Sequence, residues 1–151
     1  MNTARLAAKS RAHLDARFRE IGEIQCFTPP VRGWVKAIRE SLGMSTNQLA
    51  TRLGIKQPSV IALEQSEGKG TVSLATLRRA AEALDCTLVY ALIPNKPLDA
   101  TIRALARTLA RQRLEPVEHT MMPEDQTVLP RDPEAKLDEL VRDTPPRLFW
   151  N

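Results

Sequence analysis

The sequence predicts a mostly α-helical protein organised around a helix-turn-helix unit. Three observations lead to this prediction. Apolar residues recur at helical spacing through most of the chain, and glycines and prolines divide these stretches into short segments. Only 4% of the residues are aromatic, which favours a small aliphatic core. The length of 151 residues fits one domain with extensions.

The first expected helix covers residues 3–25 and is followed by a second over residues 31–42. The first has an apolar stripe, and basic residues occupy much of its remaining surface. This basic surface is compatible with a dimer arm, a DNA clamp or a solvated face. A Thr-Pro-Pro stretch at 28–30 ends the first helix, and Gly43 ends the second.

Two short helices joined by a tight turn are expected next. Ser45 followed by Gln48 makes a capping box at the start of the first of them. Gly54 suits the left-handed residue after its end, and Pro58 falls in the first turn of the second helix, where proline is tolerated. A further helix is expected after a cap at Ser73.

Residues 86–94 change character and are expected to form a strand. The segment reads Cys-Thr-Leu-Val-Tyr-Ala-Leu-Ile-Pro, rich in residues that favour strands. Since the preceding chain is helical, this strand would leave its backbone groups unpaired unless a second copy supplied a partner. The segment therefore predicts a homodimer. The residues expected to carry the dimer strand are Thr87, Val89, Tyr90 and Ile93.

An amphipathic helix is expected over residues 98–114. Arginines recur on one of its faces, where either phosphate contacts or plain solvation would suit them. Repeated prolines follow, with a short helix expected over 133–142. The expected organisation is an N-terminal helix at 1–28, a helix-turn-helix DNA-binding domain with its terminal strand at 31–94, the amphipathic helix at 95–114, and an acidic Pro-rich tail at 115–151.

Charge is distributed unevenly along the chain. Residues 1–114 hold 18 basic and 9 acidic residues, a net charge of +9, whereas residues 115–151 hold 4 and 9, a net charge of −5. A basic body with an acidic tail suits a polyanion-binding domain that carries an interaction segment. A solvated surface of uneven sign is the alternative.

The remaining residue types give no indication of catalysis. Cys26 and Cys86 lack ligand spacing, and neither His13 nor His119 has a recognisable partner, so neither a metal, a cofactor nor an enzyme activity is expected. No apolar run approaches the roughly 20 residues that a membrane span needs. The N-terminus lacks the apolar core of a secretion signal. A cytoplasmic protein without a membrane partner is therefore expected.

The helix-turn-helix stretch predicts a DNA-binding surface. Apolar positions would pack its two helices together and leave a slender, uncharged face on the second, in which glutamine can pair with adenine. The residues expected to read bases are Gln57, Pro58, Ala62 and Gln65. Hydroxyls, amines and helix N-termini bind phosphates. The residues expected to do so are Thr46, Asn47, Arg52, Lys56, Ser59 and Lys69.

The stretch LGMSTNQLATRLGIKQPSVIALEQSEGKGTVSLATLRRAAEALDC resembles the lambda-repressor-like (Xre/Cro-type) helix-turn-helix domain over roughly residues 32–86. With the strand that follows, the chain is similar to HipB-type antitoxins. Three segments of the chain resemble a narrower family, mobile mystery protein A. They are GWVKAIRESLGMS, GTVSLATLRRAAEALDCTLVYALIP and HTMMPEDQ. The resemblance implies a homodimer on an inverted repeat of double-stranded DNA. It also implies a buried ion pair between Arg39 and Glu64.

Members of that narrower family are typically encoded beside mobile mystery protein B, which carries a Fic domain. The resemblance therefore implies a transcriptional autorepressor that is also the antitoxin partner of a Fic-domain protein. The alternative is a protein-only toxin inhibitor that uses the helix-turn-helix as a scaffold. Two positions depart from the family. Lys56 replaces the usual Ser or Thr cap, and Ile61 stands where a polar residue is common, as a base contact, a partner contact or a tolerated surface residue.

Overall fold

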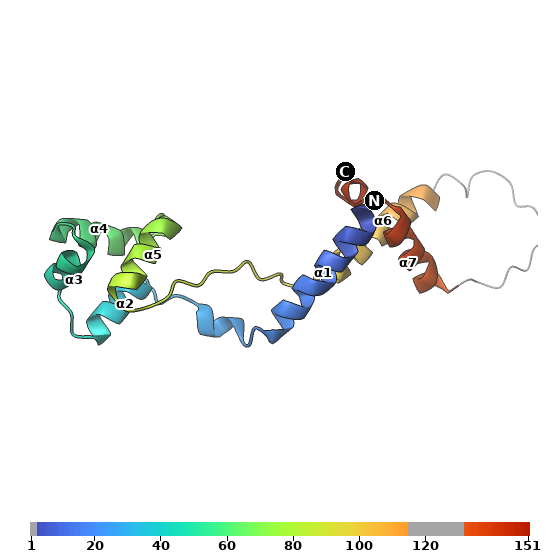
Figure 1. Ribbon diagram of the computed structural model, residues 1–151. Helices are drawn as coiled ribbons and strands as arrows, with labels where there is room; N and C mark the ends of the chain where they lie inside the picture. Colours follow the sequence, from blue (N-terminus) through green and yellow to red (C-terminus); the bar gives the residue numbers. More distant parts are fainter. Residues whose placement is uncertain (1–2, 115–131) are drawn as a thin grey trace, which may run out of the picture. The chain divides into compact units, whose positions relative to one another are not determined.

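The computed structural model describes residues 3–114 and 132–151, which form two compact units (Figure 1). Unit 2 consists of residues 23–91. Unit 1 combines the described parts of residues 1–22 and 92–151. Unit 2 is therefore inserted, in sequence, between the two parts of unit 1. The described residues are helical and contain no strand, and none of their helices has the length and apolar character that crossing a membrane requires.

Unit 2 contains the helix-turn-helix stretch and packs its helices around one aliphatic core. Its elements are the short 3-10 helix η1 (Ile24–Phe27), α2 (Trp34–Ser41), α3 (Thr46–Leu53), α4 (Gln57–Gly68) and α5 (Leu74–Ala83). The buried core residues are Val35, Leu49, Ala50, Val60, Leu63, Ala80 and Leu84. Every helix of α2–α5 contributes to this core, and α4 does so with Val60 and Leu63.

The local signals in unit 2 act as the sequence predicts. Ser45 accepts a hydrogen bond from the Gln48 N–H, and the Gln48 side chain accepts one from the Ser45 N–H, which completes the capping box of α3. Gly54 follows α3 with a φ of 67°. Pro58 lies in the first turn of α4, and the Ser73 hydroxyl caps α5. The turn between α3 and α4 is therefore specified by its own residues.

The strand expected over residues 86–94 is absent from the described part of the structure. The segment has no regular hydrogen-bonding pattern, and Val89, Tyr90 and Leu92 are exposed. The physical reason is that a strand requires a neighbouring strand, and the single chain supplies none. High β-propensity alone does not order an unpaired segment.

Unit 1 brings together helices from both parts of its sequence. It contains α1 (Thr3–Glu20), α6 (Leu98–Leu114), α7 (Pro133–Asp143) and the 3-10 helix η2 (Pro146–Trp150). Its buried core consists of Ile102, Ala106, Leu137 and Phe149, and Ala4 of α1 is buried as well. The first helix ends at Glu20, before the expected residue 25, because Gly22 interrupts it and a separate 3-10 turn follows.

Charged side chains join α6 to α7. The Arg103 guanidinium contacts Glu134 at 3.3 Å and Asp138 at 2.6 Å, and Arg107 contacts Glu134 at 3.2 Å. Arg103 also pairs with Asp99 one turn earlier, at 2.9 Å. These two arginines of α6 therefore hold α7 through ion pairs. Their partners Glu134 and Asp138 are among the acidic residues of the segment 115–151.

A carboxylate from α1 caps the beginning of α6. Asp15 accepts hydrogen bonds from the backbone N–H groups of Leu98 at 2.8 Å and Asp99 at 3.1 Å. The N–H groups of a first helical turn have no partner within their own helix, so an outside carboxylate both satisfies them and complements the helix dipole. This contact ties together segments 83 residues apart in sequence.

Candidate nucleic-acid interface

Helix α4 has one buried side and one free side. Val60, Leu63 and Glu64 are buried against the rest of unit 2. All four residues that the sequence predicts to read bases are exposed on α4, namely Gln57, Pro58, Ala62 and Gln65. These four residues are uncharged and polar or small, and the exposed Ile61 lies on the same helix, so the free side of α4 can approach base edges in the major groove.

The first residue of α4 is oriented by the first residue of α3. The Gln57 side-chain amide donates a hydrogen bond from Nε2 to Oγ1 of Thr46, at 2.8 Å. A glutamine amide has two N–H donors and one carbonyl acceptor. One donor is therefore engaged with Thr46, while the second donor and the Oε1 acceptor remain available for a ligand.

The residues predicted to contact phosphate divide into two groups. Asn47, Lys56, Ser59 and Lys69 are exposed, and Thr46 is half-buried. Arg52 differs from these, because its Nε donates a hydrogen bond to the Ala83 carbonyl oxygen at the end of α5, at 2.6 Å. Arg52 therefore links α3 to α5. Lys56 precedes α4 without a side-chain cap, so the positive end of the α4 dipole is open to an anion.

A buried ion pair fixes α4 to α2. Arg39 Nε lies 2.5 Å from Glu64 Oε1, and its NH2 group donates to Glu64 Oε2 at 3.1 Å. The remaining NH1 group donates to the Met44 carbonyl oxygen at 2.8 Å, just before α3. Both side chains are less than a tenth exposed. The hydrogen bond to Glu64 raises the pKa of Arg39 above its already high usual value.

Glu67 has a structural role that the sequence patterns did not reveal. Its carboxylate accepts hydrogen bonds from the backbone N–H groups of Trp34, at 2.8 Å, and Val35, at 3.0 Å. It thereby caps α2, whose own preceding residue, Gly33, has no side chain. Gly33 has a φ of +88°, and a Cβ there would lie 2.6 Å from the Glu67 carboxyl carbon. The sequence contains one sign of this contact: Gly33 lies directly before α2 and has no side chain with which to cap it.

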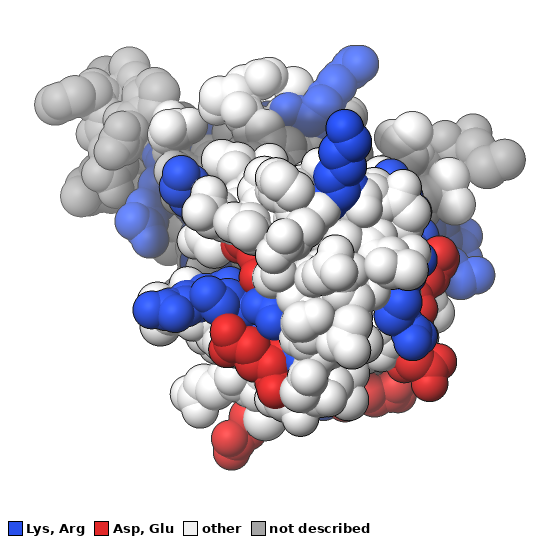
Figure 2. Space-filling model, turned by 90° about the vertical axis from the view of Figure 1, so that its left-hand side faces the viewer, with Lys and Arg blue, Asp and Glu red and all other residues white. Residues whose placement is uncertain are grey.

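The charges of the molecule surround an uncharged area. Figure 2 shows the side on which α3 lies in Figure 1. The middle of this face is uncharged, Lys and Arg side chains stand around it, and Asp and Glu side chains lie at its sides and towards the bottom of the view. Of the two buried or half-buried acidic groups of α4, Glu64 is paired with Arg39, and Glu67 accepts hydrogen bonds from the beginning of α2. This arrangement favours an anionic ligand with an uncharged recognition surface.

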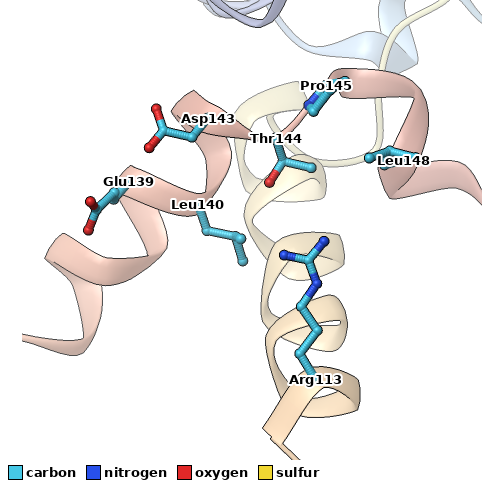
Figure 3. Close-up of a pocket in the computed structure, with 7 residues that line it drawn as sticks. All are labelled: Arg113, Glu139, Leu140, Asp143, Thr144, Pro145 and Leu148. Carbon is cyan, nitrogen blue, oxygen red and sulfur yellow. The ribbon is translucent and has the colours of Figure 1, made fainter.

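Unit 1 contains a surface pocket beside α6, α7 and η2 (Figure 3). The Arg113 guanidinium and the Leu140 and Leu148 side chains point into it, whereas the carboxylates of Glu139 and Asp143 point away. Among residues 3–114 and 132–151, no three His, Cys, Asp or Glu side chains gather as metal ligands. The lining of the pocket therefore combines one cation, two carboxylates, the Thr144 hydroxyl group and apolar side chains.

The comparisons with known proteins agree with this geometry for one part of the chain. Residues 35–90 match the model of a family described as helix-turn-helix. A search of curated proteins and a search of solved structures found no match. The matched residues include most of α2 and all of α3–α5, and thus the exposed side of α4 and the ion pair beneath it. Residues 35–90 are therefore similar to helix-turn-helix domains, a kind of domain with which regulators bind DNA.

Proposed function

We propose that the protein is a sequence-specific transcriptional regulator that reads double-stranded DNA with the exposed side of α4. The observation that carries this proposal is the uncharged free side of a helix whose other side is anchored by Val60, Leu63 and Glu64. Basic and hydroxyl groups around this helix would contact phosphates, and Gln57, Pro58, Ala62 and Gln65 would face the bases.

Gln57 would be the main base-reading residue, and Thr46 would position it. Pairing with adenine requires an amide that donates to N7 and accepts from N6. The hydrogen bond from Nε2 to Thr46 leaves one donor and one acceptor in this arrangement. The Thr46 hydroxyl hydrogen is then free to reach a phosphate. Thr46 and Gln57 would together form one contact that runs from a DNA phosphate to a base.

Replacing Gln57 with alanine is expected to weaken binding to the preferred site by about 1–3 kcal/mol, roughly 5-fold to 150-fold, with little effect on random DNA. The measurement is a gel shift on DNA from upstream of the protein's own reading frame, with random duplex as competitor. Gln112→Ala, an exposed glutamine on α6, is the matched control. If Gln57→Ala bound with undiminished selectivity, Gln57 would not read bases.

The regulator would act as a homodimer on an inverted repeat, with two α4 helices in successive major grooves about 34 Å apart. The proposed dimer contact pairs residues 86–93 with the same segment of a second copy. Two properties support it. The segment is rich in β-branched and aromatic residues, and Val89 and Tyr90 are 74% and 66% exposed. Pairing would satisfy its backbone groups and cover these side chains.

Val89→Pro is expected to make the protein monomeric, because proline removes a backbone donor from the middle of the proposed ladder. Sedimentation velocity measures the outcome. Val89→Thr keeps both the donor and the β-branched side chain, and it should remain dimeric. An intact dimer of Val89→Pro would contradict pairing through this segment.

We further propose that the protein represses its own transcription and acts as the antitoxin partner of a Fic-domain protein. The support is the resemblance carried by residues 33–45, 70–94 and 119–126, of which the last lie outside the described residues. Co-expression with a Fic-domain protein encoded beside it provides the test. If the two proteins did not co-purify and repression remained intact, the antitoxin proposal would be refuted. The protein would then be a regulator without a Fic-domain partner.

A further inference from the structure

Helix α1 carries a row of basic side chains on its exposed side. Arg5, Lys9, His13 and Arg17 follow one another at intervals of four residues, and all four are exposed. The opposite side of the helix packs into unit 1 through Ala4, Ala7, Arg11, Leu14 and Phe18, which are buried or half-buried. The row therefore faces away from the packed side of unit 1 along most of the helix.

The charge of this row is not neutralised within the described residues. Neither Arg5, Lys9 nor Arg17 has an acidic group within ion-pair distance there, whereas Arg11, on the packed side, lies 3.7 Å from Asp99. The nearby carboxylate of Asp15 is engaged at the beginning of α6. Asp99 of α6 and Glu134 and Asp138 of α7 pair with Arg103 and Arg107.

Helix stability accounts for Arg17, which lies in the last turn and complements the helix dipole, but not for Arg5 and Lys9. Like charges at four-residue spacing destabilise a helix by about 0.2–0.5 kcal/mol per pair. The first turn of α1 contains no acidic residue, so Arg5 also opposes the helix dipole. In the same unit, α6 shows the stabilising alternative, with Asp99 and Arg103 paired at four-residue spacing. The basic row of α1 is better explained by an anionic partner than by solvation of the helix.

Resting on the proposed function, we propose that the exposed face of α1 binds the phosphate backbone of the same DNA, beside the site read by unit 2. Successive side chains of the row are about 6 Å apart, so Arg5 and Arg17 span about 18 Å. This length corresponds to about five base-pair steps at 3.4 Å. Such contact is independent of base sequence, because it is made to phosphates and not to base edges.

The connection between the units favours DNA as this partner. The two units belong to one chain, which passes from one to the other after residue 22 and after residue 91. Once unit 2 is bound, the flanking phosphates are therefore present at a high local concentration around unit 1. An acidic protein would have no such advantage. The row would lengthen the contact with DNA beyond the major grooves that α4 enters.

The test compares the full-length protein with the variant R5A/K9A/R17A. The control is K136A/R142A/R147A, which removes the same charge from exposed positions on α7 and η2. Each phosphate contact contributes about 0.9 to the slope of log affinity against log salt. On an operator with 15 or so flanking base pairs on each side, about 1.5 helical turns, the α1 variant should lower this slope by about 2–3 for each protomer, and therefore by about 5 for the proposed homodimer. The control variant should leave it unchanged. Circular dichroism verifies that helix content is retained.

Three DNAs separate the outcomes. On an operator trimmed to the region protected by unit 2, the α1 variant and the wild type should have equal slopes. On random duplex, the α1 variant should again show the smaller slope. The α1 proposal would be overturned if the wild type and the α1 variant had equal slopes on the flanked operator and on random duplex. It would also be overturned if the slope of the control variant fell as much as that of the α1 variant. If the wild type selected no site but the α1 variant still lost slope on random duplex, the proposed sequence-specific function would fail while this proposal stood.

Discussion

Replacing Glu64 with leucine is expected to lower the free energy of unfolding of unit 2 by about 3–5 kcal/mol, because the substitution leaves the Arg39 charge buried without its partner. Arg39 is only 7% exposed, and two of its three hydrogen bonds go to the Glu64 carboxylate. The remaining bond to the Met44 carbonyl does not neutralise the charge, and the other nearby carboxylate, Glu40, is exposed and lies 3.7 Å away, where solvent screens it. This loss approaches the whole stability of a small domain.

The double variant Arg39→Met, Glu64→Leu is the informative control, since replacing both members of a buried pair with apolar residues is often neutral or stabilising. Denaturant unfolding followed by Trp34 fluorescence, in a Trp150→Phe background, reports on unit 2. We expect the double variant to recover most of the stability that Glu64→Leu loses. Wild-type stability of the single variant would show that the pair does not hold α4 to α2.

The raised pKa of Arg39 determines how this contribution depends on pH. A cation whose pKa is raised in the folded state contributes fully below its unfolded pKa, and the contribution is lost only as the pH rises through the raised value. For arginine this window lies above neutral pH by several units. The stabilising effect of the Arg39 charge is therefore constant across neutral pH.

Phe149→Ala is expected to lower the free energy of unfolding of unit 1 by about 3–5 kcal/mol, the usual effect of removing a buried aromatic ring. Phe149 is 6% exposed and is the aromatic residue in the buried core formed with Ile102, Ala106 and Leu137. Helix α1 packs against η2 as well as α6 and α7. The loss of packing at Phe149 should therefore also destabilise α1, which lies at the other end of the sequence. Hydrogen exchange of α1 amides should therefore accelerate.

The neighbouring residue provides a matched control for this substitution. Trp150 is 65% exposed, so Trp150→Ala should change the exchange of α1 amides little. Amides of α3 and α4 in unit 2 should keep their protection in both variants. Unchanged protection of α1 in Phe149→Ala would contradict the packing of α1 with η2 and the core of unit 1.

The helices of unit 2 could be predicted because their boundaries depend on nearby residues. Ser45 and Gln48 satisfy each other's backbone groups within one turn, and Gly54 supplies its left-handed conformation by itself. Ser73 likewise caps α5 with its own hydroxyl. The exposure of Gln57 and Gln65 follows from the same helical periodicity. Interactions between residues only a few positions apart can be recognised in the sequence itself.

The interactions that escaped prediction join distant residues. Glu67 caps α2 across 33 residues, and Asp15 caps α6 across 83. Nothing in the local pattern around either carboxylate indicates which helix it meets. The hydrogen bond from Arg52 to Ala83 is of the same kind, and it gives a packing role to a side chain expected at a phosphate. The strand over 86–94 was predicted from propensity, although a strand depends on a partner.

The order of helices along the chain also determines the order in which the two units can form on the ribosome. All residues of unit 2 have been synthesised before α6 begins at Leu98. Helix α1, in contrast, is made first and has no core to join until α6, α7 and η2 follow. At about 5–20 residues per second, this interval is on the order of ten seconds. For that time α1 is a nascent amphipathic helix with its apolar side uncovered. An interruption of synthesis after residue 91 would yield unit 2 with α1 attached but without the other helices of unit 1.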